Sequence, residues 1–375
     1  MQIAILGAGM VGRAMAIDLA AKYDVTSFDI NHQSLQILSQ KNSTIKTIKA
    51  DLSNYNNYNL LLKDFDYVIS AVPGFMGYQC LQAIIKAKKN VVDISFFSEN
   101  ALMLHQLAIE NDVTAIVDCG VAPGMSNLIL GYYNERMKIT SFECMVGGLP
   151  KKRIYPFEYK APFSPIDVLE EYTRPARYVE NGKIVTRPAL SDAELIDFDK
   201  VGTLESFNTD GLRSILFTMP HIANMKEKTL RYPGHIALMQ GLIKAGFLST
   251  QTINFKGQQV SPVEFTSTLL FDQWKLGENE EEFTLMQINI SDNKKTICYN
   301  LYDEYDAATQ TSSMSRTTGY TCTAALNMLI EKVFTAKGVF PPELVGKDET
   351  CFNFILQYLA ERNVNYTRLE NKLLN

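Results

Sequence analysis

Short apolar runs alternate with amphipathic stretches along the first third of the chain. The amphipathic stretches, for example at residues 78–88 and 99–110, have the spacing of helices with one apolar face. The apolar runs have the length of strands, and they occupy residues 3–6, 25–30, 45–48, 67–72, 91–94 and 115–117. Strands that are buried on both faces show such continuous runs, and their alternation with helices requires a parallel sheet. The pattern therefore predicts an α/β fold, with a Rossmann-type doubly wound parallel sheet.

The pattern changes after residue 124, where aromatic, proline and polar residues are mixed. Residues 284–290 and 296–302 flank a polar loop, which predicts a β-hairpin in an antiparallel sheet. Apolar positions recur at helical spacing in residues 317–334 and 352–361. We therefore expect three parts: a Rossmann domain over residues 1–122, an α+β domain over residues 123–335, and a helical segment over residues 336–375 that packs back toward the first domain.

Residues 7–12 have the spacing G-x-G-x-x-G between the first predicted strand and a helix-forming stretch. Glycine at these positions allows a tight turn and a close approach of the backbone to a pyrophosphate, next to the N-terminus of the helix. Asp29 ends the second apolar run, about 20 residues further on, where a carboxylate binds the ribose 2′-hydroxyl. Because an acid there repels a 2′-phosphate, the pattern predicts NAD as cofactor. The contacts that we expect in this region are Gly7, Gly9, Met10, Val11, Gly12 and Asp29.

Ligands of an open α/β sheet bind at the carboxyl ends of its strands, so the residues after the later runs are further candidates. For each of them, an ordinary loop or strand–helix turn is the alternative interpretation. The candidate cofactor contacts are Asp51, Leu52, Ala71, Val72, Pro73, Asp93 and Ser95. Residues 118–125 contain two glycines and a proline, which marks a rigid turn where the chain leaves the first domain. A ligand-binding cleft is typical of such a junction.

Composition and charge exclude several other classes of protein. A chain of 375 residues is long enough for two domains, and its net charge of −5 gives no electrostatic reason to expect nucleic acid. No apolar stretch approaches the ~20 residues of a membrane span, and the first residues lack the basic region of a signal peptide. The six cysteines form no C-x-x-C pair, which indicates reduced thiols in a cytoplasmic protein. The four histidines have no metal-ligand spacing, so we expect no metal.

Several longer motifs resemble the saccharopine dehydrogenase family, in its glutamate-forming reductase branch. Within that family the chain is most similar to the lysine 6-dehydrogenases, and the resemblance extends over nearly the whole sequence. The residues that carry it are 118–125, 147–150, 159–167, 171–178, 209–213, 230–235 and 316–320. The resemblance implies NAD-dependent oxidative deamination of lysine at its ε-carbon, which gives allysine and, after cyclisation, piperideine-6-carboxylate. It also implies a substrate and oligomerisation domain.

Three other functions remain open on the sequence alone. The first is a saccharopine dehydrogenase that acts on a secondary amine between lysine and a second acid. The second is a dehydrogenase of a carboxyspermidine-type polyamine, and the third is an NAD-binding regulator without activity. Apolar sheet faces and the predicted helix at residues 317–334 indicate a subunit interface, so we expect a homo-oligomer, a dimer or a tetramer.

The chemistry of lysine determines the residue types that its site requires. An arginine suits the α-carboxylate, and Arg174, Arg213 and Arg231 are the candidates, with a surface ion pair as the alternative for each. Asp210, followed by Glu99, is the candidate for the α-ammonium, although Asp210 could also cap a helix. The ε-amine must lose a proton before hydride transfer, and the candidate bases are His235 and Lys160. The expected wall around the substrate comprises Gly120, Pro123, Gly124, Gly147 and Gly148.

Overall fold

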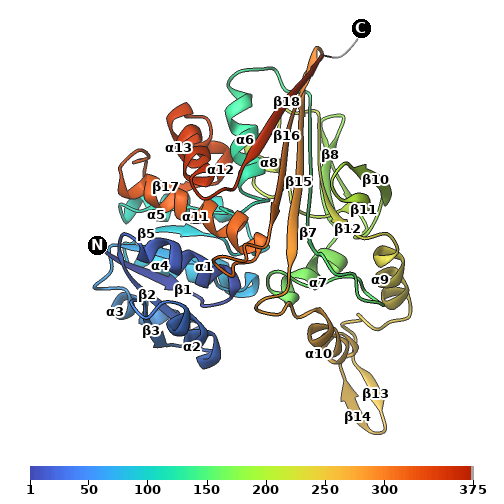
Figure 1. Ribbon diagram of the computed structural model, residues 1–375, viewed down its shortest axis with the longest axis horizontal. Coiled ribbons are helices and arrows are strands. Elements are labelled where there is room, and N and C mark those ends of the chain that lie inside the picture. Colours follow the sequence, from blue (N-terminus) through green and yellow to red (C-terminus); the bar gives the residue numbers. More distant parts are fainter. Residues whose placement is uncertain (373–375) are drawn as a thin grey trace.

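The computed structural model describes residues 1–372 and contains two large sheets (Figure 1). The first sheet has seven parallel strands in the order β17-β6-β5-β4-β1-β2-β3. Its strands are β1 Gln2–Leu6, β2 Asp24–Asp29, β3 Lys46–Lys49, β4 Tyr67–Ser70, β5 Asn90–Asp93, β6 Thr114–Ile116 and β17 Gly338–Phe340. The strand order reverses between β1 and β4, and a ligand crevice is expected at this point. The predicted Rossmann-type sheet is confirmed.

Helices cover both faces of the first sheet. Strand β1 shows this, because its four buried residues are all apolar and alternate between the two faces. Ile3 and Ile5 belong to one apolar cluster with α1 and α2, whereas Ala4 and Leu6 belong to another with α3, α4 and α5. Alternate residues of a strand point to opposite faces, so these clusters are the two layers of a doubly wound domain. Its helices are α1 Met10–Ala20, α2 His32–Lys41, η1 Tyr55–Asn57, α3 Tyr58–Leu61, α4 Gly74–Lys86, η2 Ala101–Leu104 and α5 His105–Glu110.

The second sheet is mixed, with β7 and β12 paired in parallel and its other strand pairs antiparallel. The predicted hairpin is present as β15 and β16, which pair from Ser291 with Thr296 to Phe283 with Glu304. Its strands are β7 Ser141–Pro150, β8 Ala176–Glu180, β9 Lys183–Arg187, β10 Glu194–Phe198, β11 Gly202–Asn208, β12 Asn224–Arg231, β15 Glu282–Ser291, β16 Lys295–Glu304 and β18 Tyr366–Lys372. The expected α+β domain is confirmed, and its sheet contains one parallel pair, β7 with β12, among antiparallel pairs.

Helices and a small hairpin of the second domain surround this sheet. The β13–β14 hairpin and α10 project away from both sheets (Figure 1). These elements are α6 Met125–Asn134, α7 Pro165–Thr173, α8 Ile215–Thr218, α9 His235–Lys244, β13 Ile253–Phe255, β14 Gln258–Val260 and α10 Pro262–Trp274. Within residues 1–372, no helix combines the length and apolar character that a bilayer-spanning segment requires.

The last part of the chain returns to both sheets. The helix α11, Ser313–Ile330, packs on α1 and on α13, Glu349–Ala360, and the short α12 covers Pro342–Val345. Strand β17 adds to the edge of the first sheet beside β6, whereas β18 adds to the second sheet beside β16. Residues 336–372 therefore contain two helices and two strands, rather than helices alone.

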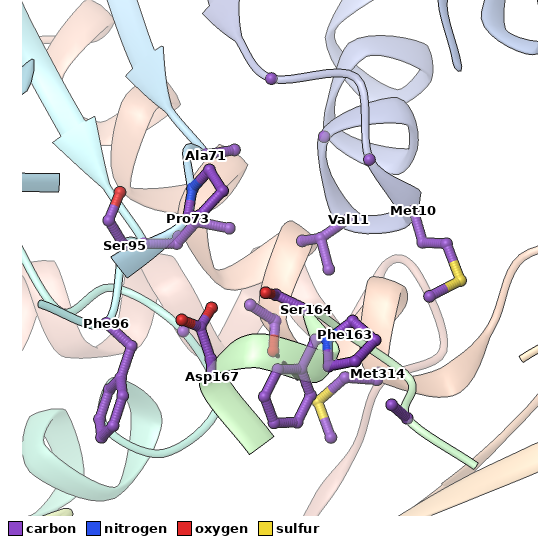
Figure 2. Close-up of a pocket in the computed structure, with 18 of the residues that line it drawn as sticks. Met10, Val11, Ala71, Pro73, Ser95, Phe96, Phe163, Ser164, Asp167 and Met314 are labelled. Carbon is purple, nitrogen blue, oxygen red and sulfur yellow. Dashed lines mark hydrogen bonds between the residues drawn. The ribbon is translucent and has the colours of Figure 1, made fainter. Parts of the chain in front are cut away.

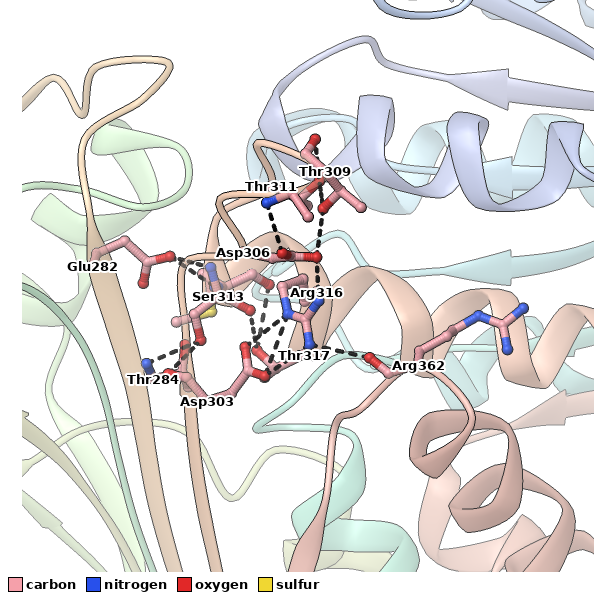
Figure 3. A network of polar contacts seen from close by, with 12 residues as sticks. Glu282, Thr284, Asp303, Asp306, Thr309, Thr311, Ser313, Arg316, Thr317 and Arg362 are labelled. Atoms are coloured by element: carbon pink, nitrogen blue, oxygen red, sulfur yellow. Dashed lines mark hydrogen bonds and ion pairs between the residues drawn. The ribbon is translucent and has the colours of Figure 1, made fainter. Parts of the chain in front are cut away.

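Buried polar contacts fix the beginning of α11 (Figure 3). The backbone N–H groups of Ser313 and Met314 donate to one carboxylate oxygen of Glu282, from β15. The Arg316 guanidinium forms an ion pair of 3.1 Å with Asp303, from β16. Because free N–H groups and a positive dipole end occur at a helix N-terminus, a carboxylate there is favourable. These contacts attach α11 to the second sheet while its other side packs on α1.

The burial of α11 corrects the expectation that this helix forms a subunit interface. Fifteen of its eighteen residues are buried within the chain. Gly319 of α11 faces α1, where a Cβ atom would lie 3.2 Å from Cγ of Met15. The apolar pattern at residues 317–334 therefore arises from contacts between the two domains of one chain.

Two helical glycines provide a test of this packing. A Cβ atom on Gly131 of α6 would overlap the carbonyl of Glu343 in α12, whereas a Cβ atom on Gly241 of α9 would meet nothing within 4 Å. We expect Gly131→Ala to lower the free energy of unfolding by about 1–3 kcal/mol through overpacking. Gly241→Ala should leave stability unchanged or raise it, because alanine is the better helix former by roughly 1 kcal/mol. Denaturant midpoints measure both, and an unchanged midpoint in Gly131→Ala would contradict the described contact.

Candidate functional site

A cavity of about 1260 Å³ lies between the two domains, at the carboxyl ends of the first sheet's strands. Figure 2 shows residues of both domains facing it. Those of the first domain are Met10, Val11, Ala71, Pro73, Ser95 and Phe96; the others are Phe163, Ser164, Asp167 and Met314. The cavity begins at the glycine-rich loop and ends at β12. It can therefore place a dinucleotide beside a second ligand.

The glycine-rich loop has the backbone that its sequence predicts. Gly7 has a φ of +113°, and a Cβ atom there would overlap the carbonyl of Ala71. A Cβ atom on Gly12 would overlap the carbonyl of Gly7, which shows how closely α1 packs on the loop. Gly9 has open space beside it and lines the cavity, directly before α1 begins. A pyrophosphate fits here, because the loop gives it room and the helix N-terminus presents N–H groups. The five predicted residues of this loop all line the cavity: Gly7, Gly9, Met10, Val11 and Gly12.

Asp29 holds the glycine-rich loop from the end of β2. Its carboxylate accepts hydrogen bonds from the N–H of Ala8 at 2.6 Å and from the N–H of Asn31 at 2.8 Å. Asp29 also lines the cavity, so its charge lies beside the space in which an adenosine ribose would fit. Asp51 lines the same end and accepts from the N–H and hydroxyl of Ser53; these bonds lower the pKa of Asp51.

The other predicted cofactor contacts divide into residues that line the cavity and one that does not. Leu52, Ala71, Val72, Pro73 and Ser95 line it. Asp93 is fully buried behind them and accepts hydrogen bonds from the N–H and hydroxyl of Ser95, at 2.9 and 3.0 Å. Burial raises the pKa of Asp93 to about 7. The expectation of a direct contact is corrected: Asp93 positions Ser95 and lies outside the cavity lining.

Arg231 of β12 lines the far end of the cavity and is held by a buried network. Its guanidinium donates to the hydroxyl of Tyr172 at 2.9 Å, to the carbonyl of Leu230 at 2.9 Å and to Glu171 at 2.7 Å. It also packs over the ring of Tyr159, with 4.3 Å from Cζ to the centroid. An arginine has five N–H groups, so these three bonds leave two for a ligand carboxylate.

The other two predicted arginines differ in position. Arg174 lines the cavity, pairs with Glu170 and lies over the ring of Phe96. Arg213 does not line it: its guanidinium bonds Asp118 at 2.8 Å and the carbonyl of Phe97. Both partners belong to the first domain, so Arg213 joins the two domains and corrects the expectation of a substrate contact.

His235 lies behind the cavity lining, on the far side of Tyr172. Its Nδ1 is 2.8 Å from the carbonyl of Phe157, which can only accept, so Nδ1 carries the hydrogen. Its Nε2 then accepts from the hydroxyl of Tyr172 at 2.9 Å. Burial, followed by the charge of Arg231, lowers the pKa of His235 to about 3. His235 does not line the cavity, and Tyr172 and Phe157 occupy its two ring nitrogens, so its position corrects the expectation that it contacts the substrate as a base.

The remaining three predicted polar residues, Lys160, Asp210 and Glu99, lie in different parts of the structure. Lys160 lies outside the cavity lining, and its ammonium donates to the carbonyl of Gln273 at 2.9 Å. Asp210 lines the cavity, but the Arg177 guanidinium binds both of its carboxylate oxygens at 2.8 Å. Glu99 borders a second cavity, of about 150 Å³, instead.

The junction turn forms part of the cavity wall. Gly120, Pro123, Gly147 and Gly148 line the cavity as expected. Gly124 does not, since it lies against the backbone of Gly120 with a φ of +142°, where a Cβ atom would overlap that residue. Gly124 is therefore required for the turn and not for a direct contact with a ligand.

The second domain contributes more acids than cations to the cavity lining. Its eight acids are Asp167, Glu170, Glu171, Asp210, Glu227, Asp272, Glu278 and Glu280, of which Glu278 pairs with Arg13 of the first domain. Its three cations are Arg174, Arg231 and Lys275. Of these acids, only Asp210 is a candidate from the sequence. Recognition of residues 224–231 as a strand would also have indicated Glu227, because it lies on the same face of that strand as Arg231. No group of three or more metal-ligating side chains occurs within residues 1–372.

Comparisons with known proteins match both domains. The family model of the saccharopine dehydrogenase NADP binding domain matches residues 3–116, and that of the saccharopine dehydrogenase C-terminal domain matches residues 120–364. The solved structure of apo saccharopine dehydrogenase (L-Glu forming) from Saccharomyces cerevisiae superposes with a TM-score of 0.78 over the whole of both chains, at 19% identity. This likeness establishes the fold.

Curated relatives are similar at low identity. The yeast saccharopine dehydrogenase [NADP(+), L-glutamate-forming] is 28% identical over 66% of this chain and 58% of its own length. Carboxyaminopropylagmatine dehydrogenase from Synechocystis is 22% identical over 92% of this chain and 93% of its own length. The mitochondrial alpha-aminoadipic semialdehyde synthase of Rattus norvegicus is 24% identical over 72% of this chain, which spans only 31% of that relative. Because the matched domains cover nearly the whole sequence, the chain belongs to the saccharopine dehydrogenase family.

Proposed function

We propose that the protein is an NAD-dependent dehydrogenase that oxidises the ε-carbon of lysine. We refer to the part of the cavity that the second domain lines as the chamber; it lies beside the glycine-rich dinucleotide site. The observation that supports the proposal is the negative charge of this chamber. Lysine has two ammonium groups and one carboxylate, whereas saccharopine has three carboxylates. A chamber lined by eight acids and three cations suits the cationic amino acid better.

Arg231 is the group that would bind the α-carboxylate. Its charge is permanent, and two of its N–H groups have no protein partner among residues 1–372. Asp210 lies at the same end of the cavity and would receive the α-ammonium, with Arg177 keeping its carboxylate in place. These contacts orient the ε-carbon toward the first domain, and orientation is a major part of such catalysis. A bound nicotinamide supplies the chemistry by accepting a hydride from that carbon.

NAD is the cofactor that Asp29 favours. The carboxylate lines the adenosine end of the cavity and is fixed by two backbone N–H groups, so it cannot turn away from a 2′-phosphate. Its negative charge would repel that phosphate and accept from a ribose 2′-hydroxyl.

A second candidate substrate is a polyamine that carries one carboxylate. The Synechocystis relative is matched over nearly the full length of both chains, and its name specifies a substrate of this class. Such an amine is cationic, so the acid-lined chamber suits it as well. Saccharopine is the third candidate, supported by the yeast relative.

Turnover of a substrate series tests the proposal. The full chain is incubated with NAD and either lysine, saccharopine or carboxyspermidine, and NADH absorbance is followed. We expect NADH formation with lysine. Turnover with only one of the other amines would replace lysine by that amine, and NADH binding without any turnover would indicate a non-catalytic protein.

Gly9→Ala tests the dinucleotide site. Because a Cβ atom at Gly9 meets no protein atom, the variant should keep the thermal midpoint of the wild type. The methyl group would occupy the space of the pyrophosphate, so we expect NADH affinity to fall by about tenfold or more, equal to roughly 1.4 kcal/mol. Fluorescence titration with NADH measures the affinity, and wild-type affinity in Gly9→Ala would contradict the placement of the pyrophosphate.

Asp29→Asn tests the choice of cofactor. The substitution removes the negative charge and keeps an oxygen that can accept from the N–H of Ala8. We expect the ratio of NADP to NAD in kcat/KM to rise by about tenfold, equal to roughly 1.4 kcal/mol of relieved repulsion. An unchanged ratio would show that Asp29 does not face the 2′ position.

A further inference from the structure

A carboxylate in the chamber lacks any protein partner. Glu227 of β12 is 7% exposed and lines the cavity, and among residues 1–372 its side chain has no hydrogen-bond or ion-pair partner. A Cβ atom on Gly211 would overlap this carboxyl group, so the glycine allows it to lie directly against the backbone. A buried carboxyl without a partner is costly, and a binding or catalytic role offsets such a cost in many proteins.

Glu227 and Arg231 project from the same face of one strand. Thr229 lies between them and also lines the cavity, whereas Lys228 bonds Glu194 on the opposite face. Four residues of a strand span about 13 Å between Cα atoms. Side chains stand roughly perpendicular to a strand, so the guanidinium and the carboxyl group are separated along it by an interval of this order. Such an interval suits a short aliphatic chain with a carboxylate at one end and an ammonium at the other.

Glu227 lies in the part of the cavity that adjoins the carboxyl end of β6. It rests against Gly211, and Arg213, two residues further along the chain, bonds Asp118, which follows β6 and also lines the cavity. The carboxyl end of β6 belongs to the edge of the sheet where the reactive end of a dinucleotide binds. A ligand held by Arg231 through its carboxylate would therefore extend its amine toward Glu227 and toward the cofactor.

The other carboxylates of the chamber are less suited to take up a proton. Glu171 is bonded to Arg231, and both oxygens of Asp210 are bonded to Arg177, so Asp210 can contact an ammonium but is a weaker base. Glu170 pairs with Arg174, and Glu278 pairs with Arg13. Asp167 is a further competitor, but its Oδ1 is enclosed by protein without a partner, 3.1 Å from the position of a Cβ atom on Gly74.

We propose that the Glu227 carboxylate receives the ε-ammonium of the substrate and accepts its proton. The inference rests on the proposed function for the identity of the amine. The N–H bond breaks and the proton passes to Glu227, which leaves a neutral amine with a lone pair. The Cε–H bond then breaks, its electron pair leaves with the hydride to the nicotinamide, and the lone pair forms the C=N bond. Water adds to the resulting iminium, ammonium leaves, and the aldehyde remains; the proton on Glu227 returns to solvent.

The surroundings of Glu227 give it the proton affinity of a base. Burial, followed by the charges of Glu171 and Asp210, raises the pKa of Glu227 to about 8, while Arg213 opposes this rise. On the neighbouring strand β7, Cys144 faces it in register, with a thiol whose pKa burial raises well above its usual value. The ionised carboxylate is the form that accepts a proton, so activity should increase as pH rises through about 8.

Glu227→Gln tests the proposal by activity and by pH profile. The variant keeps the shape of the side chain and removes the base. We expect kcat/KM for lysine to fall by about 100-fold or more, and the acid limb of its pH profile to be lost. Glu227→Asp should restore part of the activity together with a pH-dependent limb. NADH affinity and the thermal midpoint should stay at the wild-type values in both variants.

The matched control is Glu143→Gln, which removes a carboxylate from the neighbouring strand β7 outside the cavity lining. It should keep the wild-type rate and pH profile. Asp167→Asn is measured alongside as the competing base. Loss of the acid limb in Asp167→Asn, together with its retention in Glu227→Gln, would overturn the assignment.

Calorimetric titration supplies a readout without turnover. The complex of the full chain with NADH is titrated with lysine and with norleucine, which lacks only the ε-amine. Wild type should bind lysine about tenfold or more tightly than norleucine, and Glu227→Gln should bind the two alike. Equal preference for lysine in both proteins would overturn the role of Glu227 and leave lysine as substrate. Failure of the wild type to bind or oxidise lysine would overturn the proposed function, and the assignment with it.

Discussion

A buried ion pair between the two domains determines the shape of the chamber. Arg213 bonds Asp118 at 2.8 Å, and the two side chains are 6% and 4% exposed. Removing one partner of such a pair leaves an unpaired buried charge, at a cost of roughly 3–5 kcal/mol. The segment that carries Arg213 also supplies Asp210 and Gly211 to the chamber wall. The pair thereby fixes the wall against which the Glu227 carboxyl rests.

A chain of neutral and charged hydrogen bonds supports the other end of the chamber. His235 accepts from Tyr172, Tyr172 accepts from Arg231, and Glu171 neutralises the guanidinium. Three bonds hold the Arg231 guanidinium, which favours one orientation of this side chain and leaves two N–H groups free within residues 1–372. This orientation depends on His235, which holds Tyr172 and does not line the cavity.

The sequence predicted those features that depend on neighbouring residues. The glycine-rich loop, the parallel sheet and the β15–β16 hairpin each have a local pattern, and each is present in the fold. The roles of His235, Arg213 and Lys160 depend on which partner the fold brings to them from distant segments, and single-sequence patterns contain no record of that pairing. Strand β17 was missed for a related reason, since its place at the sheet edge depends on pairing with β6, which lies more than 200 residues earlier in the sequence.

Strand β17 makes the nucleotide-binding unit discontinuous in sequence. It pairs with β6 and is supplied more than 200 residues after that strand ends. A fragment that stopped at the junction turn would leave the backbone N–H and carbonyl groups of β6 unpaired along the sheet edge, where a strand from another molecule could add. It would also lack α11, whose packing on α1 covers the first sheet. Separate expression of the amino-terminal unit would therefore favour aggregation. A circularly permuted chain that keeps β17 beside β6 would be a more stable minimal nucleotide-binding unit.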